Sequence, residues 1–96
     1  MNILESIHDV VDRNGIFDGI NASCGTVWLT LTNPRGAIVT VQASHDGGNT
    51  WEEYYQFENR NEGVRVRPFH ITKPIRLRIE VTGFVRQFSY RLEWRL

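Results

Sequence analysis

A tight turn between two strand-like runs is the feature that most constrains this chain. Residues 44–51 read Ser-His-Asp-Gly-Gly-Asn-Thr-Trp. The glycines tolerate positive φ, and the aspartate can accept hydrogen bonds from backbone N–H groups just ahead of it. β-Branched residues dominate 37–43, and aromatic residues dominate 51–57. Because both compositions favour strands, the sequence predicts a β-hairpin whose loop is closed by the threonine hydroxyl and covered by the indole.

Five positions of this turn match S-x-D-x-G-x-T-W: Ser44, Asp46, Gly48, Thr50 and Trp51. The stretch resembles the Asp-box, a hairpin that recurs in sialidase propellers and occurs singly in other β domains, including small phage virion proteins. The resemblance covers eight of the 96 residues. A propeller of several four-stranded blades is excluded on length. Since the boxes of that family lie away from the catalytic centre, the resemblance implies a structural hairpin with no catalytic or metal-binding role.

Further strands follow from alternation of apolar and polar residues. Clean alternation runs through 26–32, 75–81 and 88–96, and the turn residues Asn-Pro-Arg-Gly and Asn-Glu-Gly separate other segments. A shorter run at 64–67 is followed by Pro68, which is expected to end the strand or place it at a sheet edge. Regularly spaced short strands predict an all-β fold. We expect residues 1–96 to form a single-domain antiparallel β-sandwich, jelly-roll or Ig-like, with about seven to eight strands.

The first segment leaves alternatives open. Leu4, Ile7 and Val11 have helical spacing, with Asn-Gly at 14–15 as a C-cap, but 10–17 also fits a hairpin about a type I′ turn. We expect extended structure from about residue 6 onward. Residues 1–20 are also a candidate N-terminal arm that could pack on another subunit.

Composition excludes several classes of protein. An apolar content of 41% supports a folded core, and the single cysteine, Cys24, makes an internal disulfide impossible. We expect Cys24 to be a small buried residue. No basic leader precedes an apolar run, and no run reaches the length of a membrane span, so neither a membrane partner nor secretion is expected.

No catalytic or metal-binding pattern is present. His8, His45 and His70 lie in three separate segments without a metal-ligand spacing. Glu52 and Glu53 are adjacent, so in a strand they point to opposite faces and cannot act as a catalytic pair. We therefore expect no enzymatic activity, no cofactor and no metal.

The arginines form the sharpest charge pattern. Residues 1–62 carry nine acids and three bases, and residues 63–96 carry two acids and eight bases, so net charges of −6 and +6 cancel. Six arginines alternate with apolar residues in three predicted strands, which predicts a basic sheet surface if the strands are neighbours. They are the candidate interface residues: Arg65, Arg67, Arg76, Arg78, Arg91 and Arg95. Alternatively, glutamates pair with them across the strands. Nucleic acid is not the expected partner, since the net charge is zero.

Two aromatic residues suggest an alternative function. Trp28 and Tyr54 are expected opposite the core-facing residues of their strands, where aromatic rings can form a platform for sugars. That arrangement would fit a carbohydrate-binding β-sandwich module, or an adhesion protein of a tail or fibre.

Over its full length the chain resembles the compact β-sandwich proteins of tailed-phage virions. The resemblance implies a capsid decoration, or cement, protein that binds the major capsid protein or another virion protein. It further implies a homo-oligomer, with a trimer favoured, located in the virion and synthesised in the host cytoplasm. Its mechanism would be non-covalent, because binding to the assembled shell raises the cost of opening it.

Overall fold

The computed structural model describes residues 3–59 and 63–96, which contain eight β-strands and no helix. The strands are β1 (Ile3–Val11), β2 (Gly15–Ala22), β3 (Gly25–Thr32), β4 (Ile38–Ser44), β5 (Glu52–Glu58), β6 (Val64–Ile71), β7 (Ile75–Thr82) and β8 (Phe88–Arg95). No membrane-spanning helix is found among these residues.

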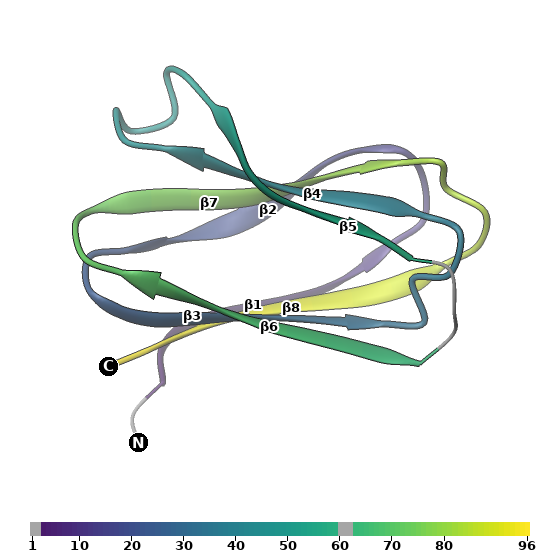
Figure 1. Ribbon diagram of the computed structural model, residues 1–96, viewed down its shortest axis with the longest axis horizontal. Helices are drawn as coiled ribbons and strands as arrows, with labels where there is room; N and C mark the ends of the chain where they lie inside the picture. Colours follow the sequence, from purple (N-terminus) through teal and green to yellow (C-terminus); the bar gives the residue numbers. More distant parts are fainter. Residues whose placement is uncertain (1–2, 60–62) are drawn as a thin grey trace.

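The strands form two antiparallel four-stranded sheets packed face to face (Figure 1). The first sheet has the order β1-β8-β3-β6, and the second has the order β2-β7-β4-β5. The pairs are nested, since β1 pairs with β8, β2 with β7, β3 with β6 and β4 with β5. This is the eight-stranded double-sheet pattern of a jelly roll. The prediction of an antiparallel β-sandwich is confirmed, and the strand order selects the jelly-roll alternative.

The core lies between the two sheets and is built from alternate residues of the strands. In β3, Val27, Leu29 and Leu31 are fully buried, whereas the residues between them are only half-buried. The inner face of β7 contributes Leu77 and Ile79, which are also fully buried. Alternation thus places one face of each strand against the opposite sheet, as the period of two requires.

The predicted central hairpin is present. β4 and β5 pair antiparallel, each beginning and ending one residue later than the predicted ranges 37–43 and 51–57. A bulge interrupts the pairing, because Val41 lies opposite Tyr55 while Gln42 lies opposite Glu53. Tyr54 is therefore the extra residue of β5.

The N-terminal segment forms neither a helix nor a hairpin. Residues 3–11 are extended, but β1 and β2 belong to different sheets, so the chain crosses between the layers at residues 12–14. Each strand buries its own apolar residue beside the crossing, Val11 before it and Phe17 after it. The Asn14 side chain fixes the crossing, because its Oδ1 accepts a hydrogen bond of 2.8 Å from the Phe84 N–H. Residues 3–20 therefore belong to the sandwich, and residues 1–2 lie outside the described residues.

Candidate binding sites

The turn at 44–51 is held by hydrogen bonds among the five residues that the sequence analysis singled out. The Ser44 hydroxyl donates to Asp46 Oδ1 at 2.7 Å and accepts from the Gly48 N–H at 2.8 Å. Asp46 accepts from both the backbone N–H of Thr50 at 2.9 Å and its hydroxyl at 2.5 Å. The Trp51 indole N–H donates to the Gly48 carbonyl at 3.0 Å. The hydrogen bonds from Thr50, above all from its hydroxyl, hold the pKa of Asp46 well below its usual range.

The six candidate arginines do not share one face. Arg65, Arg67, Arg91 and Arg95 lie in the first sheet, and Arg76 and Arg78 lie in the second. A common basic surface would require β6, β7 and β8 to be neighbours, and they are not. The arginines instead form three separate pairs, each with partners of its own.

The first pair lies on the face of β6 that is turned toward the other sheet, although both side chains remain exposed. Arg65 lies opposite Leu31 and Arg67 opposite Leu29, and residues directly opposite in a sheet share a face. The Arg67 guanidinium lies 3.9 Å from the centre of the Tyr55 ring. Val64 and Val66, which alternate with these arginines, face outward and are exposed, so the predicted assignment of faces in this strand was wrong. The arginines can face inward because β6 is an edge strand. Its inner face lies across from the edge strand β5 and not across from the centre of the core.

The second pair lies on the outer face of the second sheet, against the hairpin. The Arg78 guanidinium lies 3.8 Å from the centre of the Trp51 ring, and its Nε donates to Gln42 Oε1 at 2.8 Å. Arg76 Nη1 donates to the Gly47 carbonyl at 3.4 Å. These two arginines thus tie β7 to the turn.

The third pair holds a carboxylate on the outer face of the first sheet. Arg95 Nη2 and Arg91 Nη1 donate to the two oxygens of Glu93 at 2.6 and 3.1 Å. The Glu93 side chain is only 11% exposed. Hydrogen bonding to Arg95, followed by the smaller effects of its charge and of Arg91, lowers the pKa of Glu93. The pairing of arginine with glutamate is therefore realised here, along one strand and not across strands.

The expected sugar platform is not formed. Trp28 lies on the outer face of the first sheet, opposite Pro68 and Glu93. Tyr54 lies in the other sheet, in the bulge of β5, with its ring centre 5.4 Å from that of Phe69. The bulge removes Tyr54 from the simple alternation on which the expectation depended. The two rings therefore cannot contact one ligand as a pair.

Three of the four sheet edges are protected against pairing with another strand. β6 has Pro68 within it and points two arginines inward, Arg65 and Arg67. β5 has the bulge at Tyr54, and β2 has a bulge that includes Gly19, between Phe17 and Ile20. Proline, inward-pointing charge and bulges are the devices by which sheet proteins prevent edge-to-edge association.

The edge of β1 has a bulge only at its start, between Ile3 and Glu5, and it contains no proline. It does carry inward-pointing charge, because Glu5 and Asp9 lie opposite Trp94 and Tyr90, which pack in the core. Residues 5–11 pair with β8 in unbroken register and include no proline, lysine or arginine. At about 3.3 Å a residue, these seven residues present a free edge of about 23 Å. β1 also exposes apolar side chains: Ile3, Leu4 and Val10 are 52%, 44% and 43% exposed.

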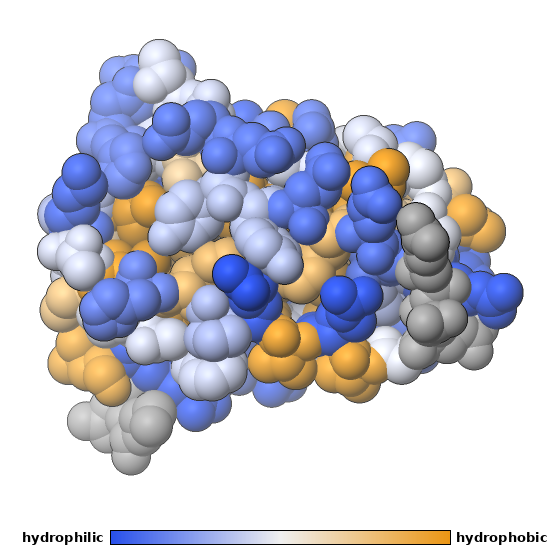
Figure 2. All heavy atoms as spheres, in the orientation of Figure 1, coloured by the Kyte–Doolittle hydropathy of each residue, from blue (hydrophilic) through white to orange (hydrophobic). Residues whose placement is uncertain are grey.

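Apolar groups also lie at the opposite edge of this sheet. Val64 and Val66 of β6 are 61% and 54% exposed and face outward. In Figure 2, apolar groups gather along the lower margin, where β6 runs in Figure 1. The outer face of the first sheet therefore has apolar borders on both sides of the Arg91–Glu93–Arg95 cluster.

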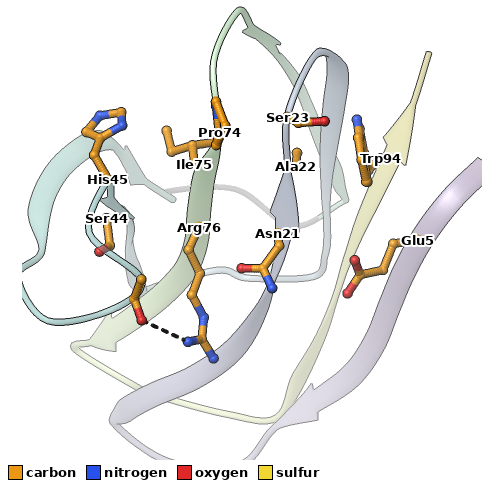
Figure 3. Close-up of a pocket in the computed structure, with 11 residues that line it drawn as sticks. Glu5, Asn21, Ala22, Ser23, Ser44, His45, Pro74, Ile75, Arg76 and Trp94 are labelled. Atoms are coloured by element: carbon orange, nitrogen blue, oxygen red, sulfur yellow. Dashed lines mark hydrogen bonds between the residues drawn. The ribbon is translucent and has the colours of Figure 1, made fainter.

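A hollow of about 330 Å³ opens at one end of the sandwich (Figure 3). Five strands contribute to it, and its walls include Trp94 and Glu5 from the first sheet and Asn21, Ile75 and Arg76 from the second. Ser44 and His45, at the start of the hairpin turn, complete one side (Figure 3). Sequence reasoning missed Glu5, Asn21 and Trp94, because nothing in the local pattern of β1, β2 or β8 indicates that these residues converge.

Within 3–59 and 63–96, no three His, Cys, Asp or Glu side chains lie close enough to hold a metal ion. Cys24 lies exposed in the turn between β2 and β3, so the expectation that it is buried was wrong.

Comparison with known proteins finds no match among protein-family models, curated proteins or solved structures.

Proposed function

We propose that this protein is a virion structural protein of the capsid-decoration type, which docks non-covalently on the major capsid protein or another virion protein. The open edge of β1 carries this proposal. An exposed strand edge with unpaired backbone groups is a template for an added strand, and β-strand addition is a recurring mode of protein recognition. Residues 5–11 of β1 also form a run of seven residues without proline or bulge, whereas proline or a bulge interrupts each of the other three edges, and this difference favours β1 as the docking site.

The charge of the edge indicates the kind of segment that it accepts. Glu5 and Asp9 lie in the open part of β1, and that part has no lysine or arginine. A complementary partner strand would carry basic residues together with apolar ones, which would contact Ile3, Leu4 and Val10. Main-chain hydrogen bonds would supply affinity, and the side chains would supply specificity.

The fold and the sequence resemblance support the virion assignment. Jelly rolls are used by viral capsid proteins and by lectins, although a fold alone does not define a function. The full-length resemblance to small tailed-phage virion proteins favours the first of these uses. Identical subunits at symmetric capsomer junctions would occupy equivalent positions, so a trimer is the expected assembly.

Cosedimentation with shells that lack the protein tests the docking site. Val10→Lys places a cation at the open edge, where it would repel a basic partner strand, and we expect at least about tenfold weaker binding. Val66→Lys is the matched control, because Val66 is an outward-facing valine on the other edge strand of the same sheet. Equal binding by wild type and Val10→Lys would refute docking at β1, and wild-type protein that does not bind shells would refute the decoration role.

Light scattering tests the assembly independently. A trimer whose mass is unchanged between low and high salt would agree with contacts made by backbone and apolar groups. A monomer at all protein concentrations would contradict the expected homo-oligomer.

A further inference from the structure

We propose that the hollow at the end of the sandwich binds the ring of a neutral sugar. The inference does not depend on the proposed function, because the hollow is lined mainly by β2, β4, β7 and β8. The aromatic residue of this site is Trp94, which lines the hollow, and not Trp28 or Tyr54, from which a sugar platform was expected.

Trp94 supplies the aromatic wall. Its side chain is half-buried against the core, and its indole N–H donates to the Cys24 carbonyl at 2.5 Å. This bond fixes the ring, so little conformational entropy is lost when a ligand contacts it. Ala22 and Ile75 provide an apolar floor. An aromatic wall with an apolar floor suits the C–H face of a pyranose.

Three planar polar groups line the rim. Glu5 and Asn21 make no side-chain hydrogen bond to any residue in the described part of the chain, and Arg76 uses one donor, in the 3.4 Å bond to Gly47. A carboxylate, an amide and a guanidinium each offer two groups side by side, which can bind a pair of neighbouring hydroxyls. The carboxylate and the guanidinium cancel in charge, so the rim favours a neutral ligand over an anion.

The size of the hollow sets the size of the ligand. Its volume of about 330 Å³ is at the lower end of the range of roughly 300–1,000 Å³ that ligand sites occupy. A single sugar ring, free or at the end of a glycan, is therefore the fitting ligand. The hairpin contributes directly, because the Gly47 carbonyl orients Arg76 at the rim.

Titration followed by ¹H–¹⁵N NMR tests the proposal at the level of single residues. The chain has three tryptophans, each with one indole N–H signal. The probes are glucose, galactose, mannose and N-acetylglucosamine, with glucuronate as an anionic comparison. We expect at least one neutral probe to shift the indole signal of Trp94 while those of Trp28 and Trp51 stay in place. No response to any neutral probe, a response at another tryptophan alone, or a response to glucuronate alone would overturn the proposal.

Substitutions at the rim provide the second test. Asn21→Ala and Glu5→Gln each remove or weaken one set of hydrogen bonds, and we expect the dissociation constant to rise about 2- to 10-fold for each. Glu58→Gln is the matched control, because Glu58 is an exposed strand residue that does not line the hollow. Unchanged affinity in both rim variants would overturn the assignment even if a sugar binds elsewhere. Val10→Lys is expected to leave sugar binding unchanged, which separates this test from that of the docking edge.

Discussion

Replacing Gly19 with alanine is expected to separate β2 from the second sheet. A Cβ atom at this position would lie 1.5 Å from the Leu77 carbonyl oxygen, whereas real Cβ atoms essentially never approach closer than 3.0 Å. The obstacle is backbone rather than a flexible side chain, so the two strands must part by about 1.5 Å or more. A ladder hydrogen bond lengthened by that amount is lost.

The size of the loss in free energy of unfolding can be estimated from the contacts made next to Gly19. Ile20 is 2% exposed, and burying such a side chain contributes about 1.5–3 kcal/mol. Two ladder hydrogen bonds add about 0.5–1.5 kcal/mol each. We therefore expect a loss of about 2.5–6 kcal/mol, a large part of the roughly 5–14 kcal/mol expected for a chain of this size. At about 4–8 °C per kcal/mol, even the smallest loss lowers the melting temperature by about 10 °C or more.

Thermal and urea unfolding followed by circular dichroism measure this effect. Gly47→Ala is the control, because a Cβ there meets nothing within 4 Å and only the positive φ of 75° is unfavourable. A cost of about 1 kcal/mol is expected for the control. If Gly19→Ala melts within a few degrees of wild type, the close pairing of β2 with β7 is wrong, and the jelly-roll order fails with it.

Three further predictions concern charged residues. Arg67→Ala should lower the free energy of unfolding by about 1 kcal/mol, because it removes the cation–π contact with Tyr55. It should also increase aggregation, measured by light scattering, because it removes an inward-pointing charge from the β6 edge. The control Lys73→Ala should have neither effect. Glu93→Gln should be less stable than wild type at pH 7 in urea unfolding, and the difference should shrink below about pH 4.5, because a group with a lowered pKa contributes stability only while it is ionised. An unchanged difference at pH 3 would contradict this reasoning. Asp46→Asn should behave in the same way below its ordinary value of 3.8, whereas Thr50→Val should destabilise the hairpin at all pH values at which Asp46 is charged.

Local sequence was sufficient for features that depend on neighbours along the chain. The hairpin at 44–51 could be predicted because its hydrogen bonds join residues at most four positions apart, such as Ser44 with Gly48 and Asp46 with Thr50. The strand at 88–96 could be predicted because alternation alone places Phe88, Tyr90 and Leu92 on one face.

Features that depend on the layer of each strand could not be predicted in this way. The alternating sequence of β6 is equally compatible with valine inward or arginine inward, and only the pairing of Arg67 with Leu29 decides between them. In the same way, nothing local distinguishes a hairpin at 10–17 from a crossing between sheets, since both need a turn at Asn14.

The sequence by itself therefore determined that the chain forms short antiparallel strands, where the central hairpin lies and which residues hold it. Only the tertiary structure decided the strand order, the separation of the arginines into three pairs, the open edge of β1 and the hollow that joins Glu5, Asn21 and Trp94. The physical reason is the distance along the chain over which each interaction acts. Backbone propensity, alternation and turn hydrogen bonds act over a few residues, whereas the choice of sheet and of facing side chains is set by contacts between segments far apart in the chain.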